Sequence, residues 1–269
     1  MKNLRQVPVF TIKGTSFLVD IDQQVLRQTN KLDNEISFID DMKDMGTHYE
    51  MYYDGMTGIK HHEADQDDAL SENWIKVPLM VELDPEGMAA KYGFTTDQIK
   101  RKTDFEVIVD QDALGRRLAG ELPKINIAGE LFVVDLRLQE LRHAHNFHPV
   151  LSLKSFDLTP DGWKYEAYYH PVLKQVVEID WKLTEFPDHV VRIHLPNELG
   201  LDPVGTARRY GIEERALLRR HPISQDLKAD VIPLSETHIP ALIQHNRNQL
   251  QQEHQETARR IRPKQRPQF

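Results

Sequence analysis

The 269-residue sequence contains no cysteine, which excludes disulfide bonds, thiolate metal ligands and a cysteine nucleophile. It also has no apolar run near the roughly 20 residues that a membrane-spanning helix needs. The first residues, MKNLRQVPVFTIKG, lack the apolar stretch and the cleavage site of a secretory signal. These absences predict a cytoplasmic protein that does not enter a membrane.

Complete catalytic motifs are missing as well. The sequence holds no Gly-rich phosphate loop, no Gly-x-Ser-x-Gly and no His-Glu-x-x-His. HAHNFH at His143–His148 groups three histidines, but no carboxylate or fourth ligand stands at helical spacing from them. We therefore assign no catalytic residue, no metal ligand and no cofactor. A metal-dependent enzyme that uses this His-rich segment stays as an alternative.

Charge is distributed unevenly along the chain. The net charge is −8, yet Ala241–Phe269 carries six basic and two acidic residues, a net charge of +4. The remainder therefore carries −12. A basic tail on an acidic body predicts contact with nucleic acid, with an acidic partner or with the body itself. A solvated tail that only keeps the protein in solution fits the same pattern.

The most informative feature of the sequence is an internal duplication. LDPEGMAAKYG at Leu83–Gly93 returns as LDPVGTARRYG at Leu201–Gly211, 118 residues later. VPVFTIKGTSFLVDIDQQVLRQ from Val7 likewise aligns with LPKINIAGELFVVDLRLQELRH from Leu122. Collinear matches over about 100 residues predict two copies of one domain, at residues 5–105 and 122–222.

Each copy opens with signals for β-strands and closes with signals for helices, which predicts the α+β class. VFTI-KG-TSFLVDI and INI-AG-ELFVVDL predict hairpins that turn at Lys13-Gly14 and Ala128-Gly129. Residues 106–121 predict a connecting helix between the copies. For residues 223–269 we expect a C-terminal helix, or a partly disordered arm, that ends in the basic tail.

Two further sets of residues recur. Asp20 with Arg27, and Asp135 with Arg142, predict one ion pair within each copy. The tyrosines at 49, 52 and 53 match those at 165, 168 and 169. Strand alternation turns the middle tyrosine away from the other two, which favours core packing over stacking on nucleic-acid bases.

The repeated phrase predicts a pair of helices. Asp84 and Asp202 are expected N-caps, each followed by a proline at the first helical position. An alanine, a glycine four residues later and an aliphatic residue six beyond it resemble the helix-turn-helix motif of DNA-binding proteins. The resemblance implies that a second helix enters a DNA groove, over Thr96–Lys102 in one copy and Glu214–Arg220 in the other.

Basic residues gather where such a helix would meet phosphate. The candidate nucleic-acid-binding residues are Lys100, Arg101 and Lys102, then Arg215, Arg219 and Arg220, and in the tail Arg259, Arg260 and Arg262. Two features oppose DNA binding. Strand signals precede the motif, where a helix-turn-helix domain has a third helix. Glu213 and Glu214 also place negative charge at the start of the second candidate DNA-binding helix. The alternative is that each helical hairpin only caps the sheet of its own copy.

The sequence thus predicts a non-enzymatic, two-lobed binding or adaptor protein. Its partner is nucleic acid, bound through the helical hairpins and the basic tail, or a protein. A scaffold that binds only protein partners is the alternative to nucleic-acid contact.

Overall fold

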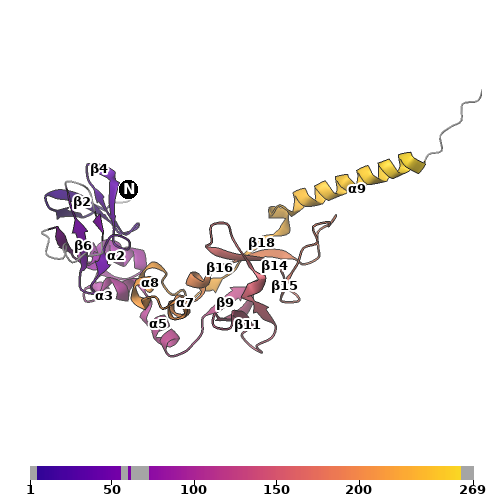
Figure 1. Cartoon of the computed structure of the whole chain (residues 1–269). Coiled ribbons are helices and arrows are strands. Elements are labelled where there is room, and N and C mark those ends of the chain that lie inside the picture. The colour runs from indigo at the N-terminus through magenta and orange to yellow at the C-terminus, as the bar shows by residue number, and fades with distance from the viewer. Residues whose placement is uncertain (1–4, 56–59, 62–72, 262–269) are drawn as a thin grey trace, which may run out of the picture. The chain divides into compact units, whose positions relative to one another are not determined.

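The computed structural model describes residues 5–55, 60–61 and 73–261, except for the side chains of residues 61 and 258–261. The chain divides into two compact units (Figure 1). Unit 1 comprises the chain up to Ala119 together with Tyr210–Ile223, and unit 2 comprises Gly120–Arg209 together with the chain from Ser224 onward. Each unit contains antiparallel sheets and helices, so the predicted α+β class is confirmed.

The described residues of unit 1 form two small antiparallel sheets. The first follows chain order, with β1 (Val9–Ile12), β2 (Thr15–Asp20), β3 (Val25–Gln28) and β4 (Lys31–Ser37). In the second, β6 (Tyr49–Tyr53) pairs with β5 (Lys43–Asp44), β7 (Lys60–His61) and β8 (Trp74–Val77). Alternation along β6 buries Tyr49 and Tyr53 in the core and turns Tyr52 to the other face, as predicted.

Short helices complete unit 1: α1 (Met80–Leu83), α2 (Pro85–Tyr92), α3 (Thr96–Ile99), α4 (Asp104–Ile108), α5 (Gln111–Leu118) and α8 (Glu214–Arg220). Helix α2 begins as predicted, because the Asp84 carboxylate accepts the N–H of Gly87 and proline is the first helical residue. It ends at Gly93, whose φ of 73° is left-handed. Helix α5 lies within residues 106–121, where the sequence predicts a connecting helix.

Two sheets are likewise formed by the part of unit 2 that the structure describes. The first joins β9 (Lys124–Ile127), β10 (Glu130–Asp135), β11 (Glu140–His143) and β12 (Val150–Ser152), and β17 (Leu227–Lys228) is added parallel to β9. The second joins β13 (Asp157–Leu158), β14 (Lys164–His170), β15 (Gln175–Val177), β16 (Val191–Pro196) and β18 (Asp230–Pro233). Strand β16 occupies one edge of β14, so β13 and β15 share the other edge.

Strand pairing has the same register in both units. Leu18 faces Arg27 across β2 and β3, and the residues 115 positions later, Val133 and Arg142, face each other across β10 and β11. Lys13 and Ala128 begin the predicted hairpin turns with φ of 47° and 52°, each followed by a left-handed glycine. Both sequence predictions of hairpins are therefore confirmed.

The predicted ion pairs are confirmed as well. Arg27 Nε lies 2.9 Å from Asp20 Oδ2, and Arg142 Nη2 lies 2.8 Å from Asp135 Oδ2. Each pair joins one end of a strand to a neighbouring strand on the same sheet.

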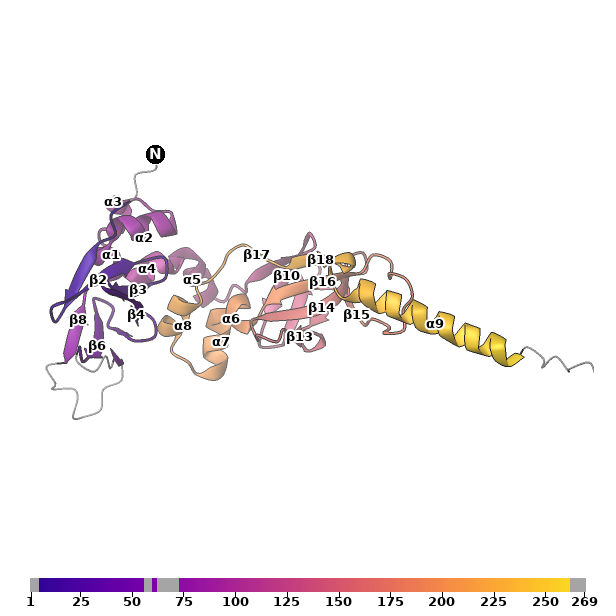
Figure 2. The same ribbon diagram turned by 90° about the horizontal axis from the view of Figure 1, so that it is seen from above.

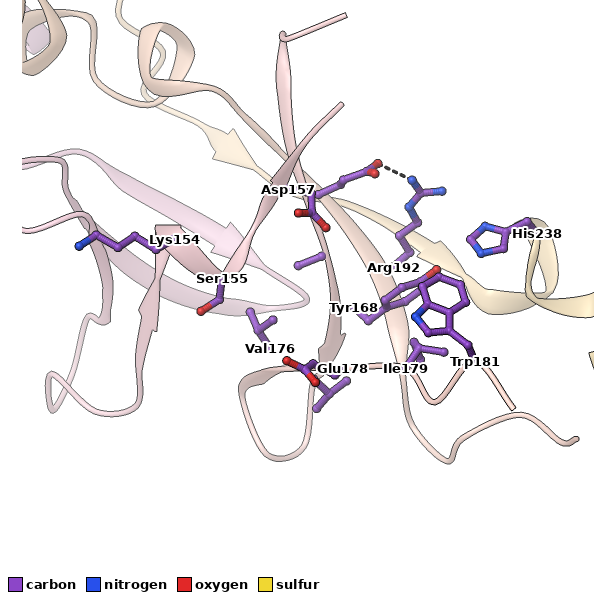
Figure 3. A pocket seen from close by; sticks show the side chains of 13 residues that line it. Lys154, Ser155, Asp157, Tyr168, Val176, Glu178, Ile179, Trp181, Arg192 and His238 are labelled. Atoms are coloured by element: carbon purple, nitrogen blue, oxygen red, sulfur yellow. Dashed lines mark hydrogen bonds and ion pairs between the residues drawn. The ribbon is translucent and has the colours of Figure 1, made fainter. Parts of the chain in front are cut away.

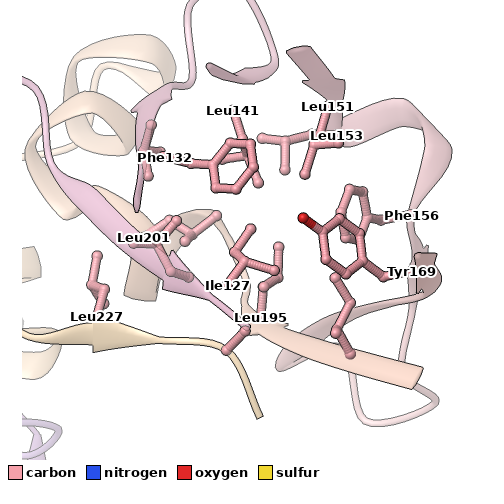
Figure 4. Packing of buried hydrophobic residues seen from close by; sticks show 14 of the residues in the cluster. Ile127, Phe132, Leu141, Leu151, Leu153, Phe156, Tyr169, Leu195, Leu201 and Leu227 are labelled. Atoms are coloured by element: carbon pink, nitrogen blue, oxygen red, sulfur yellow. The ribbon is translucent and has the colours of Figure 1, made fainter. Parts of the chain in front are cut away.

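The core of unit 2 fills the space between its two sheets (Figure 4). Its members include Ile127, Phe132, Leu141, Tyr169, Leu195 and Leu201, all nearly inaccessible to solvent. Leu201 ends α6 (Glu198–Leu201), and the buried Asp202 then accepts the N–H of Gly205 at the start of α7 (Pro203–Tyr210). The aspartate and the proline that begin α7 repeat the arrangement at α2.

The predicted C-terminal helix is α9 (Ile239–Ile261), which also belongs to unit 2 (Figure 2). Its first two turns bury Ile239, Ile243 and Asn246, whereas the side chains from Arg247 to Thr257 are exposed. Within the described part of the chain, no helix combines the length and the apolar character needed to cross a membrane. The last residues of the basic tail lie outside the described residues.

The helix pairs of the two matching sequence segments are distributed differently between the units. In the first segment α2 and α3 both belong to unit 1, whereas in the second the boundary follows Arg209, so that α8 belongs to unit 1. The sequence-based domain 122–222 therefore does not coincide with a compact unit. Contacts that side chains of α8 make in unit 1 explain the difference.

Candidate functional site

The helix predicted to read nucleic acid in the second copy, Glu214–Arg220, is α8. Its Arg219 is a buried residue of unit 1, with only 5% of the side chain exposed. One guanidinium nitrogen, Nη2, donates to the Tyr49 hydroxyl at 3.0 Å and to the Phe38 carbonyl at 3.2 Å. The guanidinium lies 4.9 Å from the centre of the Tyr49 ring, and Nη1 lies 3.4 Å from the Asp44 carboxylate.

A second buried acid completes this network. The Tyr49 hydroxyl donates to Asp104, whose carboxylate also accepts the N–H groups of Met80 and Val81 at 2.8 Å. Burial raises the pKa of Asp104 above its usual value, although these hydrogen bonds and the charge of Arg219 act in the opposite direction. Burial also raises the pKa of Tyr49, and the carboxylate of Asp104 adds to the effect. The network therefore joins α8, β6 and the start of α1.

The other two candidate arginines of α8 also contact acidic residues of unit 1. Arg215 lies 4.5 Å above the ring of Phe105, with Nε 3.3 Å from Asp44. Arg220 pairs with Asp40 at the surface. Cation–π contact and charge pairing therefore hold α8 on unit 1, and the charges of these arginines are largely matched there.

The candidates Lys100, Arg101 and Lys102 lie just beyond a helix, because α3 ends at Ile99. Lys100 pairs with Asp97 at 2.6 Å, and the Lys102 amine lies 5.8 Å from the centre of the Phe94 ring. Arg101 is exposed, and no partner for it is found among the described residues. The side chains of Arg259 and Arg260, and Arg262 as a whole, lie outside the described residues.

The His-rich segment is used in local packing. His143 is 5% exposed, with Nε2 2.9 Å from Glu130 and Nδ1 2.8 Å from Asn146. The described residues contain no group of three His, Asp or Glu side chains arranged to hold a metal ion.

Unit 2 contains a pocket of about 750 Å³ at the gap where β13 and β15 meet the same edge of β14 (Figure 3). Lining residues come from the η1 turn (Leu153–Ser155), from these three strands, from the loop that follows β15, from β16 and from the segment before α9. The polar and aromatic members are Lys154, Ser155, Asp157, Glu166, Tyr168, Glu178, Trp181, Arg192 and His238.

Trp181 is the most distinctive residue of this pocket, because the residue is 59% exposed. One face of the indole stacks on His238, with ring centres 5.8 Å apart and planes 16° apart. Its backbone is fixed, since the buried Asn246 of α9 donates to the carbonyls of Trp181 and Leu183 at 2.8 Å. An exposed aromatic side chain therefore stands on a backbone segment that is hydrogen-bonded to α9.

Charges in the pocket fall into two groups. Arg192 pairs with Glu166 (dashed line in Figure 3), so these two neutralise each other. Asp157 and Glu178 have no partner among the described residues. Figure 3 shows the amine of Lys154 far from Trp181 and turned away from both carboxylates. The lining of the pocket therefore includes two acidic side chains without a counter-charge among the described residues.

A smaller hollow of about 490 Å³ lies on unit 1, near β2 and α2. Its basic residues already have partners, since Arg27 contacts Asp20 and the Lys91 amine donates to the carbonyls of Ile21 and Asp22. The pocket of unit 2 is therefore the better candidate site.

Comparison with known proteins yields no match to a family model, to a curated protein or to a solved structure. Sequence reasoning missed Trp181 and His238, which lie outside the recurring pattern. The one available signal was a tryptophan, a bulky apolar residue, in a polar segment.

Proposed function

We propose that the chain is a two-lobed binding protein built from two copies of one α+β domain, and that it holds a protein partner in the pocket of unit 2. The observation that carries the proposal is the exposed and rigidly anchored Trp181 in that pocket. Exposed aromatic residues with little conformational freedom are typical anchors of protein interfaces.

The duplication is supported by strand register. β6 pairs Tyr49 with Val77 and Met51 with Ile75, and β14 pairs the aligned residues, Tyr165 with Leu195 and Ala167 with Ile193. The first sheets agree in the same way. Register is set by many side chains at once, so shared register favours common ancestry over convergence.

A protein partner is favoured over nucleic acid by the state of α8. Its three arginines are engaged by Asp40, Asp44 and Tyr49 of unit 1. Releasing Arg219 toward phosphate would leave the buried Phe38 carbonyl without this donor and would remove one of the two arginines that pair with Asp44, which is costly. Binding rather than catalysis is favoured because the charged groups of this network pair with one another within unit 1.

The test is capture from nuclease-treated lysate on immobilised full-length chain. We expect a protein to be retained by wild type and by Trp163→Ala, and lost with Trp181→Ala. Trp163 is a matched control because it is exposed to the same degree in unit 2, 57%, but does not line the pocket. Equal retention by all three chains, or retention that disappears after nuclease treatment, contradicts the proposal.

Nucleic-acid contact is retained as a second candidate on one observation, the exposed Arg101 beside Lys100 after α3. If Arg101 contacts phosphate, Arg101→Ala should weaken duplex binding. It should also reduce the slope of the logarithm of the binding constant against the logarithm of salt concentration by about one. No binding of any duplex or single strand at low salt removes this candidate.

A further inference from the structure

The pocket of unit 2 has the chemistry of a site for one particular side chain. Its walls combine an exposed indole, the half-buried Tyr168 and two carboxylates that lack partners, Asp157 and Glu178. Negative charge beside aromatic faces favours a cation, because the face of an aromatic ring carries negative electrostatic potential.

Unit 1 uses this combination internally. Arg219 lies over the ring of Tyr49 and Arg215 over the ring of Phe105, and both reach the carboxylate of Asp44. Twice around the same aspartate, therefore, an arginine contacts an aromatic ring and a carboxylate at once. In the pocket of unit 2 the rings and the acids are present, and the only arginine, Arg192, is already paired with Glu166.

We propose that this pocket accepts an arginine side chain of the partner protein, an inference that rests on the proposed function. The guanidinium would stack on the indole face of Trp181 that His238 leaves open and pair with Asp157 or Glu178. Arginine is favoured over lysine because its planar guanidinium stacks on aromatic rings and binds carboxylates in a fixed fork.

The anchoring of the indole strengthens the proposal. Asn246 fixes the backbone at Trp181, and Arg247 donates to the Thr184 carbonyl at 2.6 Å, so the loop from Trp181 to Thr184 is tied to α9 at two points. Little conformational entropy is then lost when a ligand stacks on the ring. Such pre-organisation is a property of binding sites more than of surfaces that only face water.

The test is a titration of the ¹⁵N-labelled full-length chain with acetyl-Gly-Arg-Gly-amide, followed at the indole N–H resonance of Trp181. That resonance is assigned by its absence in Trp181→Phe. We expect saturable shifts with the arginine peptide and at least tenfold weaker binding of the citrulline analogue, which has the same shape without the charge. The lysine analogue is expected to bind at least threefold more weakly.

The matched variants are Asp157→Asn with Glu178→Gln, and Glu185→Gln with Asp188→Asn. The second pair makes the same charge change at exposed residues of unit 2 outside the pocket. We expect the first pair to weaken arginine binding at least tenfold and the second to leave it within twofold. An unchanged indole resonance in the free variants shows that the pocket remains folded.

Two results overturn the inference: no saturable shift with the arginine peptide, or citrulline binding as tight as arginine binding. If capture of a protein depends on Trp181 but the arginine peptide does not bind, the inference falls and the proposed function stands. If the peptide binds with the expected selectivity but no protein is retained through Trp181, the arginine site stands and the proposed function falls.

Discussion

The Arg219 guanidinium donates a hydrogen bond to the Tyr49 hydroxyl at 3.0 Å, although 170 positions separate the two residues. The contact places a helix of the second sequence repeat in the first compact unit. An arginine that the sequence assigns to nucleic-acid binding therefore has a demonstrable structural partner. The consequences for stability can be measured.

Replacing Arg219 with methionine is expected to destabilise unit 1 by about 1–3 kcal/mol, because the Tyr49 hydroxyl and the Phe38 carbonyl lose a buried charged donor while Asp44 keeps its pairing with Arg215. Urea unfolding followed by the fluorescence of Trp74 measures this in a chain whose Trp163 and Trp181 are phenylalanine. The control is Arg220→Met, which breaks an exposed pair with Asp40 and is expected to cost less than about 1 kcal/mol. Equal costs would show that α8 is not anchored through Arg219.

Tyr49→Phe removes a hydroxyl that accepts from Arg219 and donates to Asp104. We expect a loss of about 1–3 kcal/mol, since two buried polar groups each lose a partner. In a double-mutant cycle with Arg219→Met the losses should be less than additive, because both changes disrupt one network. Strict additivity in the same urea assay would mean that the two side chains act independently.

Tyr169→Phe is expected to have the opposite effect at neutral pH. The Tyr169 hydroxyl is buried in unit 2, beside Phe156 in Figure 4, and has no hydrogen-bond partner among the described residues. Removing an unsatisfied buried hydroxyl should leave unit 2 equally stable or stabilise it by about 1 kcal/mol. Fluorescence of Trp163 and Trp181 in a Trp74→Phe chain reports the unfolding. A loss above about 1 kcal/mol would reveal a partner for the hydroxyl.

The same variant should also change how the stability of unit 2 depends on pH. Burial raises the pKa of Tyr169 to about 12, above that of the unfolded chain, so unfolded Tyr169 loses its proton first as pH rises. The stability from the neutral phenol is complete below about pH 10 and is lost between pH 10 and 12. Unit 2 of the Tyr169→Phe variant should therefore lose less stability than wild type between about pH 10 and 12. Parallel curves of stability against pH for the two proteins would contradict it.

Local sequence signals predicted local structure well. Gly14 and Gly129 fixed the hairpin turns through their left-handed conformation, Asp84 and the proline after it set the start of α2, and alternation along 49–53 predicted which tyrosines are buried. Each of these depends on neighbours within a few residues. The offset between copies also predicted the two matching ion pairs.

The division of the chain into two compact units could not be predicted from the sequence. The segment around α8 matches the one around α3, so pattern alone assigned it to the second copy. Its placement depends on Asp40, Asp44 and Tyr49, which lie more than 160 positions away and have no special spacing from the arginines. The pocket was missed for the same reason, because it brings Asp157, Trp181 and His238 together only in the folded chain.

The most direct test of the account is native-state hydrogen exchange of the backbone amides of α8 in three chains: wild type, Tyr49→Phe and Leu195→Ala. Leu195 is buried in the core of unit 2. We expect the amides of Leu217 and His221, which close turns of this helix, to exchange faster in Tyr49→Phe and at the wild-type rate in Leu195→Ala. Exchange that accelerates only in Leu195→Ala would show that α8 unfolds with unit 2, and would contradict the assignment of its arginines to unit 1.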